Sequence, residues 1–453
     1  MARAKKEAAL TPEERLQAAL VPDWERPYKL PENWCWTTVG AINQYVGISA
    51  DPTKAKNETF ELYSVPSSAD NYPEIVLGAD IGSAKQSVKK GDVLLCKINP
   101  RINRVWKVSK YTDHSLLASS EWIVIRNSRL ISNYLMWCLR SPYFRGYMLS
   151  NVSGVGGSLM RAQPKFVQGY PIPVPPLAEQ QRIVDRIESL FAKLDEAKEK
   201  AQAVVDSFET RKAAILHKAF TGELTAKWRE EHGVGMESWE HHQFSDLCAI
   251  VRGGSPRPAG DPRYYDGNIP FMKVADITRN DSPYVSKVEY SIKEEGLKKT
   301  RMVEANTLLL TNSGATLGVP AITTIRTTFN DGIAAFIGLD IDSLLFYYYF
   351  WTSKTAFLRS INMGAAQPNL NTKLIGEVEI DVPQTTERIE IARILNALLT
   401  KEQQAKESAE AVLDQIDLMK KSILARAFHG ELGTNDPSEE SAVELLKEII
   451  RRG

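Results

Sequence analysis

Two long stretches of the chain place apolar side chains at alternating steps of four and three residues. Lys, Glu, Asp and Gln fill most of the positions between them. This heptad spacing is typical of a helix with one narrow apolar stripe, which is buried against a second helix. We call the stripe the seam. Its positions are Ile183, Ile187, Leu190, Leu194, Ala197, Ala201, Val204, Phe208, Arg211 and Ile215 in the first stretch, and Ile391, Leu395, Leu398, Glu402, Ala405, Ala409, Val412, Ile416, Met419 and Ile423 in the second.

The second stretch repeats the first at a constant offset of 208 residues. "KAFTGEL" ends the first stretch and "RAFHGEL" ends the second, so Gly222 corresponds to Gly430. Upstream, Glu179 corresponds to Glu387, and no gap is needed over the residues between. Chance similarity between two helices would not stay in register over this length. The sequence therefore indicates an internal duplication.

Both helices have clear boundaries. Pro175 and Pro176 precede the first and Pro383 precedes the second, and proline disfavours helix in the residue before it. Gly222 and Gly430 stand where a C-cap glycine is expected. Each helix is then about 40 residues long, or ~60 Å. Helices of this length need a partner along their seam.

We expect the two helices to pair with each other in antiparallel fashion. Ala197, Ala201, Ala405 and Ala409 are small enough for a partner helix to approach closely. Antiparallel pairing gives the duplication a closed pseudo-two-fold symmetry and puts the two preceding domains at opposite ends of a rod. Parallel pairing, or two separate coiled coils with outside partners, remain the alternatives.

The remaining sequence divides into two domains with short strands, Gly and Pro punctuation and a few helices, which predicts an α+β fold with strongly bent β-sheets. Both domains close on a Gly-rich loop with Gln-Pro, at Gln163-Pro164 and at Gln367-Pro368. The predicted parts are an N-terminal helical extension (1–29), a first domain (30–175), a helix (176–225), a second domain (236–383), a helix (384–432), and a tail with an amphipathic helix (433–453).

Charge supports a nucleic-acid interface only locally. Lys plus Arg and Asp plus Glu each total 56, whereas a free-standing nucleic-acid binder is usually basic. The first domain carries the basic stretch "CKINPRINRVW", in which Arg and Lys suit phosphates or guanine and Asn suits adenine. A solvated turn with surface charges explains it equally well. The candidate DNA-contacting residues in this domain are Lys97, Asn99, Arg101, Asn103, Arg104 and Arg161.

The second domain offers weaker candidates. "RGGSPRP" and "TNSGATLG" supply flexible backbone and polar side chains, but such turns are common in β-rich domains. The aromatic run from Tyr347 to Trp351 could stack on bases, although its helical spacing favours a place in the core. The candidates are Arg252, Arg257, Lys273, Asn312 and Ser313.

No catalytic signature is found. The sequence has no GxxxxGK[ST] phosphate loop, no GxGxxG after a strand and no methyltransferase-type Asn/Asp-Pro-Pro-aromatic stretch. The cysteines Cys35, Cys96, Cys138 and Cys248 show no metal spacing and fit a reducing cytoplasm. No apolar run is long enough to span a membrane. We expect a cytoplasmic, non-catalytic chain that binds no metal or cofactor itself.

Taken together, these features resemble the specificity subunits of type I restriction–modification systems. "RGGSPRPAGDPRYYDGNIPFMKVADI" looks like the opening of a target-recognition domain, and "AQPNLNTKLIGEVEIDVP" looks like its closing segment. "PIPVPPLAEQQRIVDRIESLFAKLD" and "ILHKAFTGELT" are similar to the family's spacer helices, and "SEESAVELLKEIIRRG" to its terminal helix. The first domain departs more from the pattern, because "NQYVGISADPTKAKNE" lacks the Gly-rich opening.

The resemblance implies a function in DNA methylation and bacterial defence. Each domain would read one half of a bipartite site on double-stranded DNA, and the helices would set the spacer. Two methyltransferase subunits, which bind S-adenosylmethionine, would dock on the chain, and two ATP- and Mg-dependent restriction–translocase subunits could join. The competing hypotheses are a coiled-coil adaptor whose end domains bind proteins and a self-sufficient modifying enzyme, which the missing motifs disfavour.

Overall fold

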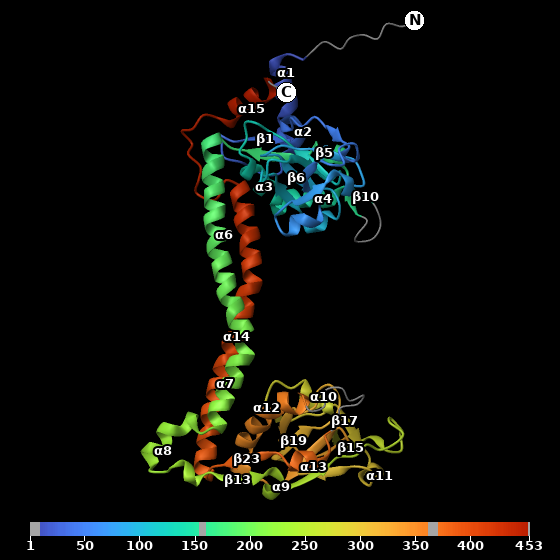
Figure 1. Cartoon of the computed structure of the whole chain (residues 1–453), viewed down its shortest axis with the longest axis vertical. Helices are drawn as coiled ribbons and strands as arrows, with labels where there is room; N and C mark the ends of the chain where they lie inside the picture. The colour runs from blue at the N-terminus through green and yellow to red at the C-terminus, as the bar shows by residue number, and fades with distance from the viewer. Residues whose placement is uncertain (1–9, 154–159, 361–369, 452–453) are drawn as a thin grey trace. The chain divides into compact units, whose positions relative to one another are not determined.

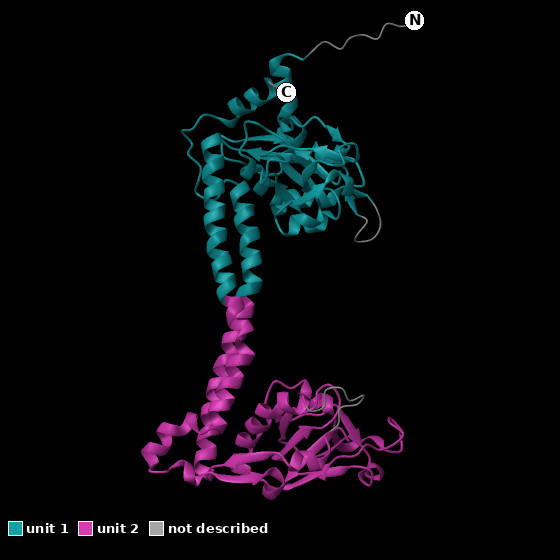
Figure 2. Ribbon diagram, in the orientation of Figure 1, with its two compact units in different colours: residues 1–200, 412–453 teal, residues 201–411 magenta. Residues whose placement is uncertain are grey.

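The computed structural model describes residues 10–153, 160–360 and 370–451 (Figure 1). The chain divides into two compact units (Figure 2). Unit 1 is formed by residues 1–200 and 412–453, and unit 2 by residues 201–411. Each unit therefore contains one globular domain together with parts of the long helices from both copies of the repeat. Gln367 and Pro368 lie outside the described residues.

Short strands form several small sheets in unit 1. The described strands of the largest sheet, in spatial order, are β2 (Ser49–Ala50), β5 (Lys85–Ser87), β8 (Ser115–Ala118), β3 (Thr59–Tyr63) and β4 (Glu74–Leu77). A second sheet has the order β7 (Val105–Lys107), β6 (Val93–Cys96) and β9 (Trp122–Ile125). Two antiparallel pairs complete the set: β1 (Cys35–Thr38) with β12 (Pro171–Val174), and β10 (Val152–Ser153) with β11 (Arg161–Ala162).

Helices cover these sheets and join the domain to the long helices. They are α1 (Pro12–Ala19), α2 (Val39–Ile42), α3 (Ser132–Arg140), α4 (Pro142–Ser150), α5 (Pro164–Val167) and α15 (Ala442–Arg451). The main core of unit 1 combines α3 and α4 with Ile183 and Ile187 of the first long helix and Phe428 at the end of the second. Leu446 and Ile449 of α15 are buried in the same core.

Unit 2 has the same plan with longer strands. One sheet has the order β14 (Ala249–Arg252), β22 (Ile333–Ile337), β19 (Thr307–Thr311), β20 (Pro320–Thr323) and β16 (Tyr284–Val285). The next has the order β17 (Tyr290–Ile292), β15 (Tyr265–Met272), β21 (Thr327–Phe329) and β18 (Arg301–Val303). The pair β13 (Glu240–Gln243) and β23 (Glu379–Val382) corresponds to β1 and β12 of unit 1.

The helices of unit 2 are mostly short, with one exception. They are α8 (Ala226–His232), α9 (Phe244–Leu247), α10 (Val274–Thr278), α11 (Glu294–Leu297), α12 (Leu344–Ser360) and α13 (Thr372–Gly376). The 17-residue α12 carries the aromatic run, and Tyr347, Tyr349, Phe350 and Trp351 are buried, as the sequence predicted. Among the described residues, no helix has the length and apolar composition that a membrane span requires.

The two long helices differ in continuity. The second copy is one helix of 44 residues, α14 (Thr385–Phe428). The first is divided at Ser207 into α6 (Leu177–Asp206) and α7 (Phe208–Phe220). The Ser207 hydroxyl donates to the Ala203 carbonyl one turn back and accepts from Arg211 one turn ahead. Hydrogen bonds of this kind compete with the helix ladder and bend it locally.

Within each unit, the two long helices run antiparallel. In unit 1, Asp195 of α6 pairs with Lys420 of α14, while Ile187, earlier in α6, shares a core with Phe428, later in α14. In unit 2, Arg211 pairs with Glu402 at 2.7 Å, and the Phe208 ring lies under Lys406. Residue numbers rise along one helix as they fall along the other, so the pairing has the direction that the sequence predicted.

Most seam positions are buried or half-buried, but the C-terminal part of α14 departs from the predicted seam. Met419 is 46% exposed and Val412 is 45% exposed. Lys420, next to Met419, faces Asp195 and lies over the Phe191 ring instead. An α-helix has 3.6 residues per turn, so a straight helix drifts away from a strict heptad spacing. From Ile416 onward, the face of α14 that packs against α6 therefore includes Lys420.

A buried carboxylate stands near the start of each long helix, at equivalent positions of the repeat. Glu179 accepts hydrogen bonds from Trp34 Nε1 (2.7 Å), Asn435 Nδ2 (2.9 Å) and Thr434 Oγ1 (3.3 Å). Trp34 belongs to the globular domain, and residues 434–435 follow the end of α14. The carboxylate thus ties together the start of one long helix, the end of the other and the domain between them.

Glu387 repeats this arrangement in unit 2 with a cation added. It accepts from Trp239 Nε1 (3.1 Å), Thr225 Oγ1 (2.7 Å) and Arg229 Nη1 (2.6 Å). Both carboxylates are 0% exposed. Thr225 and Arg229 follow the end of α7, as residues 434–435 follow α14. The duplication has therefore kept an indole donor and a threonine donor in both junctions, and Arg229 stands in the second where Asn435 stands in the first.

The glycine that ends each long helix is also required by this junction. Gly222 and Gly430 have φ values of 79° and 75°, in the left-handed region that favours glycine. A Cβ atom on Gly222 would lie 2.6 Å from the sulfur of Met236, and one on Gly430 would lie 2.5 Å from Cγ of Pro31. The repeated "GEL" thus marks a turn where backbone conformation and close packing both exclude a side chain.

We predict that Glu387→Leu destabilises the protein by about 3–5 kcal/mol, because it leaves the buried Arg229 guanidinium without its counter-ion. The measurement is the urea dependence of tryptophan fluorescence. Glu231→Ala, which removes an exposed ion pair with Lys227, is the matched control and costs less than about 1 kcal/mol. Adding Arg229→Met to Glu387→Leu recovers most of the loss. Equal effects of Glu387→Leu and Glu231→Ala would contradict the assignment.

Burial raises the pKa of Glu179 above its ordinary value of 4.5, although its hydrogen bonds act in the opposite direction. The folded chain therefore holds this proton more tightly than the unfolded chain. As a result, the contribution of Glu179 to stability falls as the pH rises from about 4.5 through the folded pKa. We expect the free energy of unfolding of the wild type, relative to Glu179→Gln, to decline over this range. A pH-independent difference between the two proteins would refute this assignment.

Candidate nucleic-acid interface

The candidate loop of unit 1 follows the central strand β6. Asn99 and Asn103 both have left-handed backbone conformations, with φ values of 45° and 53°, and they flank the single turn Pro100–Ile102. Asn tolerates this conformation better than most residues. Between these two asparagines, Arg101 and Ile102 lie exposed at the surface. The sequence thus builds a short projecting loop with an arginine at its tip.

Two of the predicted cations near this loop are already paired. Glu121 lies 3.8 Å from Lys97 Nζ and 3.5 Å from Arg161 Nη2. Lys97 Nζ also donates to the Ser120 carbonyl at 2.8 Å. The acid lowers the net positive charge here, so Arg101 is the predicted cation best placed to meet a phosphate or a base. Arg104 is half-buried behind it.

The asparagines of the loop serve its structure as well. Asn103 Nδ2 donates to the Arg140 carbonyl at 3.0 Å, which fixes the loop to the end of α3. The Asn99 and Asn103 Oδ1 atoms are buried without a hydrogen-bond partner. Such unpartnered groups are uncommon in folded proteins and often mark functional positions. Two of them therefore lie in one projecting loop.

In unit 2, the candidates assemble around Asp331, which sequence reasoning missed. Arg252 Nε donates to the Asp331 carbonyl at 2.7 Å, and Ser255 Oγ donates to Oδ1 at 2.6 Å. Arg257 lies 3.5 Å from Oδ2 and is largely exposed. Burial alone would raise the pKa of Asp331, but the Ser255 hydroxyl and the two guanidinium groups lower it overall. The carboxylate therefore stays ionised and orients Arg257 at the surface.

Asn312 and Ser313 lie beside the Asp331 cluster. Of the two, only Ser313 is partly exposed to solvent. Asn312 is 0% exposed, and neither Oδ1 nor Nδ2 has a partner. A Cβ atom on Gly332, next to Asp331, would lie 3.0 Å from Ser313 Oγ. Ser313 is half-exposed and can reach a ligand. The Asn312 side chain is enclosed by the fold, and its role as a DNA contact stays a prediction.

Lys273 is held by an aromatic contact and not by Asp331. It follows strand β15, and its Nζ lies 3.1 Å from the centre of the Tyr290 ring. A cation over an aromatic face is held by the ring quadrupole. The ammonium group is thus positioned by Tyr290 rather than extended freely into solvent. Among the candidates of unit 2, Arg257 is exposed, Arg252, Lys273 and Ser313 are half-buried, and Asn312 is buried.

The two candidate loops occupy equivalent places in their domains. Lys97 follows β6 and Asn312 follows β19, and each strand is central in its sheet. The Ala162 amide donates to the Lys97 carbonyl at 2.8 Å, and the Leu370 amide donates to the Asn312 carbonyl at 2.7 Å. Ala162 and Leu370 are again 208 residues apart. Both loops are therefore held by equivalent main-chain hydrogen bonds. The pattern of side chains in the sequence does not reveal such bonds.

Neither loop has the groups of a metal or redox site. Within the described residues, no cluster of three or more His, Cys, Asp or Glu side chains could hold a metal ion. Burial raises the pKa of the Cys35 and Cys248 thiols to about 12, so neither is a ready nucleophile. The arrangement instead offers guanidinium, amide and hydroxyl groups on projecting loops, which is the chemistry of binding.

Comparison with known proteins identifies a family. The family model described as the type I restriction modification DNA specificity domain matches the chain twice, over residues 47–205 and 236–411. The specificity subunit of the type I restriction enzyme EcoKI of Escherichia coli K12 is 21% identical over 93% of this chain and 96% of its own length. That of StySPI from Salmonella potsdam is 23% identical over the same shares of the two chains.

Solved structures show the same fold. The crystal structure of the HsdS subunit from Thermoanaerobacter tengcongensis superposes with a TM-score of 0.67 and 21% identity. A second structure, described as the structural basis of complex assembly and conformational transition of the type I R-M system, gives a TM-score of 0.68 and 21% identity. Each comparison covers 90% of this chain and all of the compared chain.

Proposed function

The chain belongs to the family of type I restriction–modification DNA specificity proteins, and we propose that it is the non-catalytic chain that selects the DNA sequence. The two family matches, over residues 47–205 and 236–411, carry this proposal. Each match contains an accessible arginine on a surface loop: Arg101 in unit 1, on the loop after β6, and Arg257 in unit 2, on the loop after β14. Two loops of different sequence on one chain fit a bipartite site whose halves differ.

We assign the base-contacting role to different groups in the two units. Arg101 stands at the tip of its loop, and Arg257 is oriented by Asp331. Arginine recognises guanine through two hydrogen bonds in the major groove. Lys97 and Arg161, which share Glu121, are better suited to positioning the loop. Each half-site would then be read by few side chains on a rigid frame.

The long helices are proposed to set the spacer between the half-sites. The continuous helix α14 has 44 residues and is therefore about 66 Å long. Its two halves pair with α6 and with α7 in different units, and the buried Glu179 and Glu387 fix each helix start to its own domain.

Catalysis is assigned to partner chains. We propose that two methyltransferase subunits dock on the helices and bring S-adenosylmethionine, and that two restriction–translocase subunits bring the ATP and Mg site. Together they would form a DNA adenine methyltransferase and an ATP-dependent endonuclease. The near-neutral charge of the chain fits this division, because partners would supply much of the phosphate contact. Its four free cysteines fit assembly in the reducing cytoplasm.

We predict that Arg257→Ala weakens discrimination at one position of one half-site by about 1–3 kcal/mol. The measurement is the dissociation constant of the chain, assembled with its methyltransferase subunits, on duplexes with single-base substitutions. Arg326→Ala removes another exposed arginine of unit 2, paired with Glu304, and is the matched control. Arg101→Ala should act on the other half-site. An Arg257→Ala effect on both half-sites would contradict separate reading.

We also predict that removing one heptad from each long helix changes the spacer. Residues 198–204 and 406–412 are equivalent in the repeat, and their joint deletion shortens each helix by about 10 Å, the rise of about three base pairs. Methylation-sensitive sequencing should report the same half-sites with a spacer about three base pairs shorter. Retention of the original spacer would rule out the helices as its determinant.

A further inference from the structure

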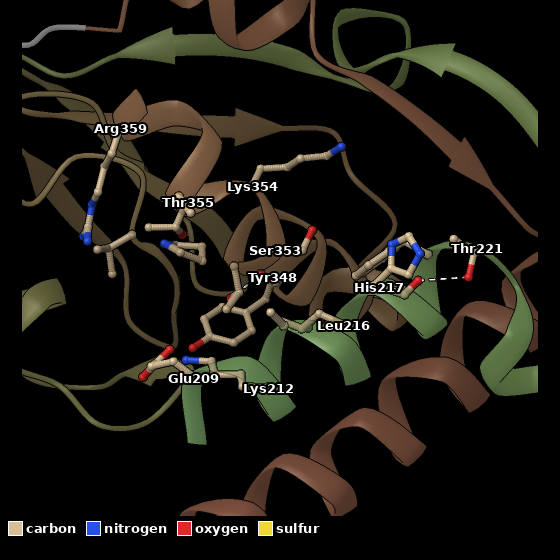
Figure 3. A pocket seen from close by; sticks show the side chains of 16 residues that line it. Glu209, Lys212, Leu216, His217, Thr221, Tyr348, Ser353, Lys354, Thr355 and Arg359 are labelled. Carbon is tan, nitrogen blue, oxygen red and sulfur yellow. Dashed lines mark hydrogen bonds between the residues drawn. The ribbon is translucent and has the colours of Figure 1, made fainter. Parts of the chain in front are cut away.

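Each unit contains a groove between a long helix and the helices of its domain. The groove of unit 2 lies between α7 and α12 and has a volume of about 820 Å³. Figure 3 looks into it, with Lys212 and His217 presented by α7, and Lys354 and Arg359 by α12. The groove of unit 1 lies between α14 and the pair α3 and α4 and has a volume of about 510 Å³. We call the groove of unit 1 the first groove and the groove of unit 2 the second groove.

The two grooves are lined by equivalent residues of the repeat. Glu209, Lys212, Ala213 and Leu216 line the second groove, and Asp417, Lys420, Lys421 and Leu424 line the first. Each pair is 208 residues apart. Helix pairing accounts for Lys420, which faces Asp195 of α6, but not for Lys212 or Lys421, which make no hydrogen bond or ion pair within the described residues. The duplication thus provides the same kind of groove in each unit.

Both grooves carry an excess of positive charge. Lys212, Lys354 and Arg359 line the second groove with Glu209 as the single acid. In the first groove the cations are Arg140, Arg145, Lys420 and Lys421, against Asp417. The chain as a whole has zero net charge. These grooves are therefore local concentrations of basic groups.

Three of these cations have no acceptor within the described parts of the chain. Lys212, Lys354 and Lys421 make no hydrogen bond or ion pair there, although Lys354 Nζ lies over the Phe350 ring. Lys420, in contrast, pairs with Asp195. Arg359 is directed by a bond from its Nε to the Leu317 carbonyl (3.1 Å). Positively charged side chains held in a concave surface without acceptors favour an anionic ligand.

Each groove is continuous with the candidate loop of its unit. Ile102 and Asn103 of the projecting loop line the first groove, and Arg145 donates to the Arg101 carbonyl. Val319 and Pro320, which follow the loop that begins at Asn312, line the second groove. A duplex held by either loop would therefore meet basic groups on the side of the long helices.

We propose that the two grooves bind the phosphodiester backbone of the DNA next to each half-site, independently of its sequence. This inference rests on the proposed function, since it takes Arg101 in unit 1 and Arg257, beside the Asn312 loop through Asp331, in unit 2 to be the base-reading groups. Lys212 in the second groove and Lys421 in the first are the phosphate contacts. Backbone contacts position a protein on the duplex without specifying bases. The apolar floor, with Leu216 and Tyr348 in the second groove, packs against deoxyribose.

The test is the salt dependence of DNA binding by the chain assembled with its methyltransferase subunits. Each cation that contacts a phosphate contributes about 0.9 to the slope of log affinity against log salt. The double variant Lys212→Gln, Lys421→Gln should lower this slope by about 1.8, with equal losses of affinity on specific and non-specific duplexes. Lys212→Arg with Lys421→Arg should retain the wild-type slope. Lys198→Gln with Lys401→Gln, on exposed positions of the same helices, is the matched control.

A wild-type slope in the double Gln variant would overturn the proposal. If that variant instead lost its methyltransferase subunits, measured by mass photometry, the grooves would be protein-docking sites and the proposal would be wrong. A change in base preference would equally refute a backbone role. Failure of the proposed function is distinguishable from all three, because the wild-type assembly would then show no preference for any DNA sequence.

Discussion

Two buried carboxylates determine how the chain is joined together. Glu179 and Glu387 are fully enclosed, and burying an ionisable group without partners is strongly unfavourable. Each is therefore stable only where the indole of its own domain and the segment after the other long helix both donate to it. That condition brings the end of one long helix to the start of the other. Antiparallel pairing in each unit follows from it.

The two junctions meet this condition with different chemistry. Glu387 has Arg229 as a buried counter-ion, whereas Glu179 is held by the neutral donors Trp34, Thr434 and Asn435. This difference explains why burial dominates the pKa of Glu179. After the duplication, the carboxylate kept its indole and threonine donors, and only the third partner differs, Asn435 in one junction and Arg229 in the other. The geometry of the junction, rather than one particular ion pair, is the constant feature.

The sequence predicted the long helices well because their physics is local and periodic. The proline before each helix, the glycine at its end and the heptad spacing between them can all be recognised in the sequence. The same template failed at Met419, because a heptad assumes 3.5 residues per turn and the helix follows 3.6. It also missed the division at Ser207, where one hydroxyl competes for backbone groups. Both departures depend on atomic detail that an apolar pattern does not contain.

The candidate site was less predictable, since its charges are balanced by residues distant in sequence. Glu121 pairs with Lys97 and Arg161, and Asp331 orients Arg257 from 74 residues away. Neither acid could be connected to its cation without the fold. Asn312 was a candidate by residue type, but its side chain is fully buried. Polar residues in the sequence thus predicted the positions of the loops. They did not predict which side chains of each loop would face a ligand.

The equivalent loops show how one frame can serve two different half-sites. The Lys97 carbonyl accepts from Ala162, and the Asn312 carbonyl accepts from Leu370. These bonds involve only main-chain atoms, so they place no constraint on the side chains at either position. One copy can carry lysine and the other asparagine without moving the loop. Since the fold holds the loops through the backbone, their side chains were free to diverge. This freedom is what a protein whose two domains recognise different DNA sequences requires.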